Sequence, residues 1–517
     1  MALRLLIALL LSISVALSQG PQRAPSREGP HLLNYVNEFR ETLKESTAAG
    51  YQYWFVDRSK LDGETLKLSV VRPHTSTHPP HRHPESEFFF LLEGTAQFTL
   101  GADTVTVRPY ASFVVPPGLL HSIRNAGEGE LKYLVIKKYG PVPFLKESPH
   151  PPTPFDTASF QDGSHHWYAI TEEEREIVPE PGQQRHPSAA IREIAENILL
   201  YQRTNGGWPK NYDMRAILTP AQRSALGKSA DELNTTIDNG ATHSQIEFLA
   251  HAADRLNDVR YRQSALRGLD YLLTAQYANG GWPQFFPDTS SYRKYITFND
   301  GAMIGVMNLL HRILRNESHY RFVDSARRER IRDAFRRGID CILRTQIVQG
   351  GSRTGWCQQH DNVDFRPRSA RTFEPAAVTG MESAEVVRFL MRLEGPPPGV
   401  IDAVQGAIRW FVRSRLAGIR IEEFDAPEMK FQYHATARDR RVVADPAAPP
   451  IWARFYALGS NRPLFCNRDG VPVFTLAEVE RERRTGYAWY TEAPAALLKE
   501  YPGWRRKHRV NNDALAP

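Results

Sequence analysis

Cysteine is rare in this sequence, which has three among 517 residues, at positions 341, 357 and 466. Three cysteines permit at most one disulfide, and their spacing matches no zinc-binding pattern. We expect them to be small buried residues, with Cys341–Cys357 as the one pair that could form a bridge. The scarcity and spacing therefore exclude a structural zinc site built from cysteines.

Long apolar runs are missing after the first 18 residues. Residues 1–18 combine Arg4, an apolar run over 5–11 and the small residue Ser18. This order is typical of a secretory signal peptide cut near Ser18. A signal anchor is the alternative, although the run is too short to span a bilayer. We therefore expect an exported protein, secreted or periplasmic, with no membrane span in its mature form.

Nucleic-acid-binding motifs are not found, and export also argues against a nucleic-acid partner. The hydrophobic content of 41%, the charged content of 24% and the length of 517 residues are those of a globular protein with two or three domains. The net charge of +7 suits an acidic polymer as partner. Many proteins are basic for solubility alone, so the charge supports such a partner without identifying it.

The pattern of residues changes several times along the chain. Prolines interrupt residues 140–187, as in a linker, and apolar residues at three- and four-residue spacing then indicate helices almost to the end. We expect a signal peptide at 1–18, an arm at 19–50 with a short helix over 33–50, an all-β domain at 51–139, a linker at 140–187 with one short structured piece around 166–174, an all-α domain at 188–505 and a tail at 506–517.

Six short runs of apolar, aromatic and β-branched residues lie between residues 65 and 139, and Gly and Pro turns separate them. They predict a small antiparallel barrel. Within this region His81 and His83 are two residues apart, so on a strand their side chains point to the same face. Glu87 and His121 can join them inside a barrel. Three imidazoles and one carboxylate suit Fe, Mn, Ni, Cu or Zn, and the alternative is a surface loop rich in proline and histidine.

This two-part pattern resembles the cupin family, whose metal ligands stand at the places of His81, His83, Glu87 and His121. The resemblance implies a double-stranded β-helix, or jelly roll, that binds a divalent transition metal such as Zn, Mn, Ni or Fe. The sequence departs from the pattern at Tyr110, where a turn glycine is expected. Cupins include dioxygenases, isomerases and binding modules, so the resemblance implies no particular reaction.

The C-terminal part contains a threefold repeat. Residues 202–210 read QRTNGGWPK, residues 276–284 read QYANGGWPQ, and a weaker copy runs from Gln346 to Gln359. Each copy follows an apolar run with helical spacing. Repeats of this kind are supersecondary units that bury their faces against neighbours, and paired helices of this type close naturally into an α/α barrel or toroid.

Two of the repeats carry an acidic residue at similar places, in the segments TIDNGA at 236–241 and TFNDGA at 297–302. Asp238 and Asp300 each stand where a helix begins. One interpretation is that they cap their own helices. The other is that carboxylates and amides from neighbouring helix starts meet and hold a hard cation such as Ca²⁺.

The stretch from about 190 to 495 resembles the family-10 polysaccharide lyases, which are pectate lyases. The matching segments keep their order, and they include the three repeat copies, GWCQQHD at 355–361 and RRTGYAWY at 483–490. The resemblance implies an α/α toroid that cleaves polygalacturonate by β-elimination with Ca²⁺ at Asp238 and Asp300. It implies Arg371 as the base, and it implies substrate binding by Lys210, Asn239, Thr372 and one or more of Arg462, Arg468 and Arg484.

An arginine base is chemically demanding, because its pKa is normally above about 12. Burial and neighbouring cations can lower a pKa, and Arg366 and Arg368 are nearby in the sequence. Lys210 is the second candidate for the base. The predicted reaction removes the C5 proton of a galacturonate, expels the O4 leaving group and forms an unsaturated product.

Other functions compete with this hypothesis. The Gln–Gly-Gly-Trp spacing is also similar to the repeats of terpene cyclases, but we find no acidic protonating motif. A non-catalytic protein that binds acidic polysaccharide, with Trp208, Trp282 and Trp356 stacked on sugars, is the second alternative, although a structural role of these tryptophans in the turns is favoured. The all-β domain has its own hypothesis, in which it acts on the unsaturated uronate that its neighbour releases.

Overall fold

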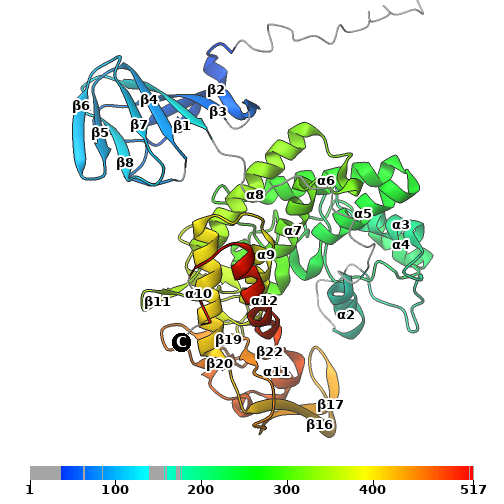
Figure 1. Ribbon diagram of the computed structural model, residues 1–517. Helices are drawn as coiled ribbons and strands as arrows, with labels where there is room; N and C mark the ends of the chain where they lie inside the picture. Colours follow the sequence, from blue (N-terminus) through cyan, green and yellow to red (C-terminus); the bar gives the residue numbers. More distant parts are fainter. Residues whose placement is uncertain are drawn as a thin grey trace, which may run out of the picture. The chain divides into compact units, whose positions relative to one another are not determined.

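The computed structural model describes residues 37–61, 64–83, 85–138, 157, 160–170, 175, 177–511 and 513–515. The predicted signal peptide and the arm as far as residue 36 lie outside these ranges. The chain divides into two compact units, Met1–Gly140 and Pro141–Pro517 (Figure 1). Among the described helices, none has the length and apolar character needed to cross a membrane.

The first unit consists of antiparallel strands in two sheets. One sheet has the strand order β1-β2-β3-β9-β4-β7, and the other has the order β6-β5-β8. The strands are β1 (Glu45–Thr47), β2 (Gly50–Leu61), β3 (Glu64–Val71), β4 (Glu87–Glu93), β5 (Ala96–Leu100), β6 (Asp103–Val107), β7 (Ser112–Val115), β8 (His121–Asn125) and β9 (Leu131–Lys138).

The core of this unit lies between the two sheets. Strand β4 buries every second residue from Glu87 to Leu91, as expected for a strand with one face inward. Phe89 of β4 lies 5.7 Å, between ring centroids, from Phe98 of β5, which stacks at 4.1 Å on Phe113 of β7. The six predicted strands are confirmed as β3 to β7 and β9, whereas β1, β2 and β8 were not among them. Closure of the two sheets into a jelly roll stays a prediction.

The predicted helix over 33–50 is wrong where the structure describes it. Residues Glu41–Leu43 form one short 3₁₀ turn, called η2, and Glu45 already pairs with Gln52 across β1 and β2. The ring of Phe39 packs 4.7 Å from that of Tyr53 on β2. A pairing partner supplied by the sheet therefore overrides the weak helical spacing of this short segment.

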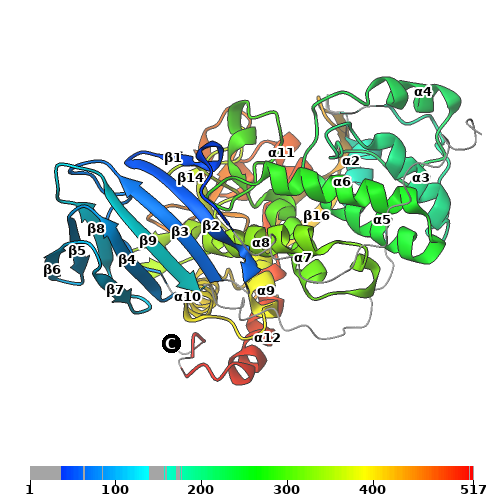
Figure 2. The same ribbon diagram turned by 90° about the horizontal axis from the view of Figure 1, so that it is seen from above.

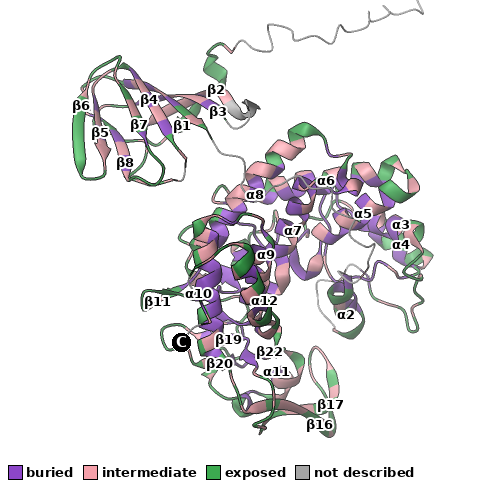
Figure 3. Ribbon diagram, viewed as in Figure 1, coloured by how far each residue is buried: buried purple, intermediate pink, exposed green. Residues whose placement is uncertain are grey.

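The second unit is mainly helical. Its longer helices are α2 (Gln161–Ala169), α3 (Ile191–Tyr201), α4 (Pro220–Lys228), α5 (His243–Leu256), α6 (Val259–Ala275), α7 (Ala302–Leu314), α8 (Ser325–Thr345), α9 (Met381–Arg392), α10 (Pro398–Ser414) and α12 (Ala493–Lys507). They pack in two rows, because α3, α5, α7, α9 and α12 touch in succession, as do α6, α8 and α10. Figure 2 shows α5 and α6 side by side, and Figure 3 shows that the buried residues follow the facing sides of the helices. Closure of the rows into a toroid stays a prediction.

The threefold repeat forms the same turn three times. The amides of Gln202, Gln276 and Gln346 each donate to a carbonyl of their own turn and to a carbonyl of a following helix, at 2.8–3.0 Å. The indole N–H groups of Trp208, Trp282 and Trp356 donate to Ile198, Leu272 and Ile342 of the preceding helices, each at 2.8 Å. All three tryptophans are fully buried. They lock the turns, and sugar stacking on them is excluded in this conformation.

The second unit differs from the expectations in its secondary structure and near both of its ends. It is not all-α, because β16 (Ile419–Lys430) and β17 (Ala435–Ala444) form a long exposed hairpin, held by many Arg–carboxylate pairs that sequence periodicity does not reveal. The three cysteines are free and buried, which confirms that they are small buried residues, and the possible Cys341–Cys357 bridge does not form. Helix α2 overlaps the short structured piece expected around 166–174. It packs with Ile177 into the main core, so part of the stretch expected as linker belongs to that core. Ala514, in the expected tail, is also buried.

Candidate functional site

The first unit brings the four predicted ligands together. His83 Nε2 lies 2.8 Å and His121 Nε2 lies 3.2 Å from the same carboxylate oxygen of Glu87. The ring of His81 lies 4.4 Å from that of His121 and 5.4 Å from that of His83, between centroids. One ligand atom from each of the four residues lies within 4.8 Å of the others. Strands β4 and β8 supply Glu87 and His121, and the backbones of His81 and His121 pair with each other.

The outer ring nitrogens of two histidines are already engaged. His83 Nδ1 lies 2.9 Å from the carbonyl oxygen of Glu85, and His121 Nδ1 lies 3.0 Å from that of Leu119. When Nδ1 donates its N–H to the carbonyl oxygen, the lone pair of Nε2 is directed at the centre, which is the arrangement found around metals. Burial and the other histidines lower the pKa of His81 to about 4, so its imidazole is neutral and able to bind a metal. These residues fit a metal with three nitrogen ligands and one oxygen ligand.

In the second unit, Asp238 and Asp300 stand in two short 3₁₀ turns that touch each other, η4 (Asp238–Gly240) and η6 (Asn299–Gly301). Each turn immediately precedes a long helix, as predicted. Asn239 and Asp300 occupy the same position in the two turns, and both have left-handed backbone conformations, with φ of 49° and 46°. The repeat therefore places equivalent polar side chains from neighbouring helix starts next to each other.

Helix capping does not explain the two aspartates. The residues at the capping positions of α5 and α7 are Thr242 and Gly301, and no side chain caps either helix. One oxygen of Asp238 accepts a hydrogen bond from Lys210 Nζ at 2.9 Å, and its other oxygen, Oδ1, is buried without a hydrogen-bond partner among the described residues. A buried carboxylate oxygen with no donor is available to a cation.

Asp300 lies in a group of acids around Arg454. The Arg454 guanidinium is 3.2 Å from Asp300 Oδ1 and 2.8 Å from Glu382 Oε1, and all but a few per cent of its surface is buried. Burial raises the pKa of Asp300 to about 6; Arg454 opposes the rise, and Asp238 adds to it. Burial and the charges of Glu382 and Asp300 raise the pKa of Glu385 to about 8. The Oε2 atoms of Glu382 and Glu385 are buried without a hydrogen-bond partner in the described part of the chain.

Sequence reasoning missed Arg454, Glu382 and Glu385. The two glutamates are three residues apart at the start of α9, in the segment GMESAEVV that corresponds to the aspartate-bearing segments of the other two repeats. That correspondence was a usable signal. No sequence signal linked Arg454 to Asp300, because more than 150 residues separate them in the chain.

Arg371 is paired with a carboxylate and not with cations. Its guanidinium and backbone N–H bind Glu374, with Nη2 to Oε1 at 2.8 Å and Nε to Oε2 at 2.9 Å. Burial acts to lower the pKa of Arg371, but Glu374 raises it well above its usual value. Arg366 and Arg368 bind Asp364 and Asp361 instead. The expected lowering of the pKa by these two arginines is therefore wrong for this state of the protein.

Tyr292 connects the two halves of the site. Tyr292 lies in a short 3₁₀ turn, η5 (Ser291–Lys294), and burial raises the pKa of its hydroxyl. The charges of Arg371, Lys210, Asp238 and Glu374 all act on that hydroxyl. Arg371 and the Lys210–Asp238 pair are therefore both close enough to influence this one hydroxyl.

The remaining predicted substrate-binding residues fall into three groups. Arg468 lies near Arg371, because both guanidinium groups contact the ring of Phe373, at 5.2 Å and 4.8 Å from its centroid. Thr372 is exposed beside them, and Asn239 donates to Asn211 next to Asp238.

Arg484 and Arg462 lie elsewhere. Arg484 makes two bonds to Asp439 of β17, at 2.7 Å and 2.8 Å, and Arg462 lies over the ring of Phe474. The contacts described for these two arginines do not include Asp238, Asp300 or Arg371. Their role in substrate binding stays a prediction.

Comparison with known proteins adds an independent finding. Residues 202–498 match the family model described as pectic acid lyase. The chain belongs to the pectic acid lyase family. Residues 67–137 match the model of the cupin domain. No curated protein matches the chain significantly.

Two solved structures support the assignment of the helical unit. A family 10 polysaccharide lyase from Cellvibrio cellulosa is 29% identical, with a TM-score of 0.52, and the match covers 61% of this chain and 93% of that one. A point mutant of that lyase in complex with trigalacturonic acid is also 29% identical, with a TM-score of 0.54, over 61% and 92% of the two chains. This pectic acid lyase is a polysaccharide lyase with an N-terminal cupin domain.

Proposed function

We propose that the protein cleaves α-1,4-linked polygalacturonate by Ca²⁺-dependent β-elimination, at a site formed by Asp238, Asp300 and Arg371. The observation that carries the proposal is the contact between the two turns that hold Asp238 and Asp300, near Arg371. The complex of the similar lyase with trigalacturonic acid supports a polyuronate as substrate. The basic net charge of +7 favours the same class of polymer.

The acidic group suits a calcium ion. Ca²⁺ takes six to eight oxygen ligands, from carboxylates, amides and water. Asp238 offers an unpartnered oxygen, and Asp300 faces it from the adjoining turn. The described chain holds no second cluster of three or more ligand side chains like that of the first unit. Substrate carboxylates and water would complete the shell, and the bound ion would stabilise charge on the uronate carboxylate during elimination.

Cationic side chains of the site would orient the polymer. Lys210 and Arg468 are each held by a carboxylate, Asp238 and Glu482 respectively. A polyuronate brings carboxylates of its own, to which an arginine binds in a bidentate way. These two residues would therefore exchange an internal partner for a substrate carboxylate.

The base must take the C5 proton as the bond to O4 breaks. We propose Arg371, which is 41% exposed although Glu374 is buried beneath it. Glu374 stabilises the protonated guanidinium, so Arg371 can accept a proton only after this pair is weakened. Lys210, which is paired with Asp238, is the second candidate.

The Arg371–Glu374 pair also gives a test of which residue is the base. In Glu374→Gln the pKa of Arg371 falls, so the pH profile of kcat shifts toward lower pH if Arg371 is the base. An unshifted profile in a folded Glu374→Gln protein would transfer the role to Lys210.

For the cupin domain we propose a resident divalent transition metal held by His81, His83, Glu87 and His121. The orientation of two imidazoles by backbone carbonyls supports this. Action of the domain on unsaturated uronate stays a hypothesis without a structural observation in its favour. Export also stays a proposal, based on residues 1–18.

One assay tests the main proposal. Purified full-length protein is incubated with polygalacturonate and Ca²⁺, and ultraviolet absorption of the double bond conjugated to the carboxylate is followed. We expect absorption to rise with Ca²⁺ and to stop after chelation. No rise under either condition would refute the lyase activity on this polymer.

A further inference from the structure

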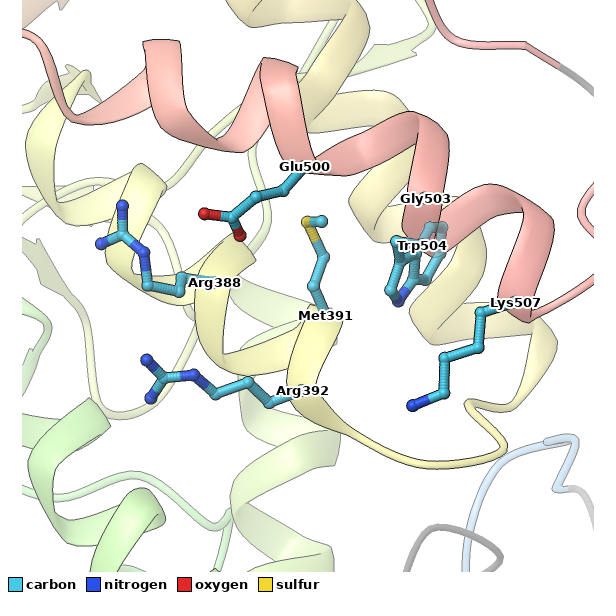
Figure 4. Close-up of a pocket in the computed structure, with 7 residues that line it drawn as sticks. All are labelled: Arg388, Met391, Arg392, Glu500, Gly503, Trp504 and Lys507. Atoms are coloured by element: carbon cyan, nitrogen blue, oxygen red, sulfur yellow. The ribbon is translucent and has the colours of Figure 1, made fainter.

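A pocket of about 390 Å³ lies between α9 and α12 (Figure 4). Arg388, Met391 and Arg392 of α9 line one side of it. Its volume lies within the range of about 300–1,000 Å³ that is typical of sites for small molecules. None of Asp238, Asp300, Arg371 and Arg454 lines the pocket. Arg388 lies one turn from Glu385 along α9, and Arg392 lies two turns, about 10 Å, from it.

The other side of the pocket is a single face of α12. Glu500, Gly503, Trp504 and Lys507 line it, at spacings of three and four residues. At Gly503 an added Cβ would meet nothing within 4 Å. This glycine therefore leaves the pocket open toward solvent, and a larger side chain there would fill the pocket without a clash at its first atom.

Positive charge dominates this pocket. Three cations, Arg388, Arg392 and Lys507, face one carboxylate, that of Glu500. Within the described chain, Arg392 and Lys507 have no acidic group at salt-bridge distance. Burial and the nearby charges of Arg388 and Arg312 lower the pKa of Arg392, while Glu500 acts in the opposite direction. The cations repel one another, and an anionic ligand would relieve this repulsion.

Trp504 contributes an unused hydrogen-bond donor. Its side chain is only 6% exposed, and its indole nitrogen is buried without a hydrogen-bond partner among the described residues. In Figure 4 this nitrogen points toward the space between Met391 and Lys507. Buried indole N–H groups normally have a partner, so this one is a donor for a ligand in the pocket.

We propose that this pocket is a second binding site for acidic oligosaccharide, which holds uronate carboxylates outside the elimination site. The inference rests on the proposed function for the identity of the sugar. The guanidinium groups of Arg388 and Arg392 lie on one side of the pocket, and Lys507 lies on the other, with Met391 and the Trp504 ring between them (Figure 4).

This arrangement favours an oligogalacturonate over a single small anion. Carboxylates repeat along the polymer and are separated by sugar rings, so one chain can reach cations at both ends while its rings cover the apolar middle. An arginine fork also matches a planar carboxylate closely. The occupant is either a segment of the uncut polymer or a released fragment, since both carry the same carboxylates.

Calorimetric titration of full-length Arg371→Ala protein with trigalacturonic acid, in the presence of Ca²⁺, tests the site. We expect two molecules bound per chain. Arg392→Ala with Lys507→Ala in the same background removes the second one or weakens it at least about tenfold, because bonds to charged groups contribute most to such binding. Gly503→Leu, which fills the pocket and leaves its charge unchanged, has the same effect. Lys499→Ala, an exposed lysine on the same helix but outside the pocket, leaves two molecules bound.

Each other outcome is decisive. Unchanged stoichiometry in the Arg392/Lys507 variant would overturn the proposal. A site that takes inorganic phosphate but not trigalacturonate would overturn the choice of ligand, and equal binding of a fully methyl-esterified trisaccharide would overturn the role of the carboxylates. If the protein has no lyase activity, the binding lost in the Arg392/Lys507 variant still supports the pocket, so the two proposals fail separately.

Discussion

The two units hold their charged side chains in different ways. In the cupin domain, three imidazoles and Glu87 already face one centre, and backbone carbonyls fix the rings of His83 and His121. In the lyase unit, Asp238 is paired with Lys210 and Asp300 with Arg454. The first arrangement is ready for a resident metal, whereas the second neutralises its acids internally.

This difference suggests how each site takes up its ion. A preformed set of ligands binds tightly, because little has to be reorganised. The aspartates of the lyase unit must give up or share a cationic partner before they bind calcium, and substrate carboxylates can take over Lys210 at that moment. Under the proposed function, calcium and polymer would enter the lyase site together, whereas a cupin metal would stay bound.

The largest effect is expected at the base. Arg371→Ala removes the group that accepts the C5 proton, and kcat falls about 10²–10⁴-fold with little change in stability. Arg366→Ala removes an exposed arginine that pairs only with Asp364, and it serves as the matched control. The rate of formation of unsaturated product measures both variants. Full activity in Arg371→Ala would exclude this residue as the base.

Loss of a cupin ligand comes next. His121→Ala removes one of four ligands, and metal affinity falls by more than about 100-fold, since even outer contacts of metal ligands are worth 10–100-fold. Elemental analysis of the purified protein measures the metal, and the elimination rate stays within about twofold of that of the wild type. A comparable loss of lyase activity would contradict the independence of the two sites. His74→Ala, an exposed histidine of the same domain, is the control.

A smaller effect is expected at the calcium site. Asp300→Asn keeps the shape and removes the charge, so the Ca²⁺ concentration for half-maximal rate rises about 10–100-fold. The rate is measured as a function of added Ca²⁺, with Asp364→Asn as a control away from the acids. An unchanged calcium requirement would separate Asp300 from the ion.

The smallest effect concerns stability in acid. Burial and the charge of His251 lower the pKa of His319 to about 3, and the two rings stack at 3.7 Å. In the unfolded chain the His319 side chain has a pKa near 6.5 and becomes protonated on acidification, whereas in the folded chain it stays neutral. His319 therefore costs the folded state about 2–3 kcal/mol between pH 7 and about pH 4.5.

The measurement for this prediction is urea unfolding at several pH values. His319→Phe reduces the loss of stability on acidification, and His165→Phe, at an exposed position, does not. Equal pH dependence of the wild type and His319→Phe would show that His319 takes up its proton without unfolding.

The sequence predicted much of this arrangement because the relevant signals are local. Alternating apolar runs revealed six strands of the cupin domain. The predicted grouping of His81, His83, Glu87 and His121 is confirmed, although His81 and His83 lie between β3 and β4 and not on a strand as expected. The repeat predicted that Asp238 and Asp300 would meet. Local patterns did not reveal the β16–β17 hairpin, whose stability comes from pairs between charged residues on two strands.

Long-range pairing explains the other misses. Arg371 was expected among cations, since Arg366 and Arg368 are close in sequence, but these side chains turn to Asp364 and Asp361 while Arg371 turns to Glu374. Arg454 reaches Asp300 from a distant part of the chain. The direction of a long side chain depends on the folded surroundings, and sequence spacing does not encode it.

The most direct test of the account is a crystal structure of the Arg371→Ala protein with trigalacturonic acid and Ca²⁺. We predict calcium between the carboxylates of Asp238 and Asp300, with a uronate carboxylate completing its shell and Lys210 moved from Asp238 onto the sugar. A trisaccharide bound at this site without calcium, or calcium bound away from both aspartates, would contradict it.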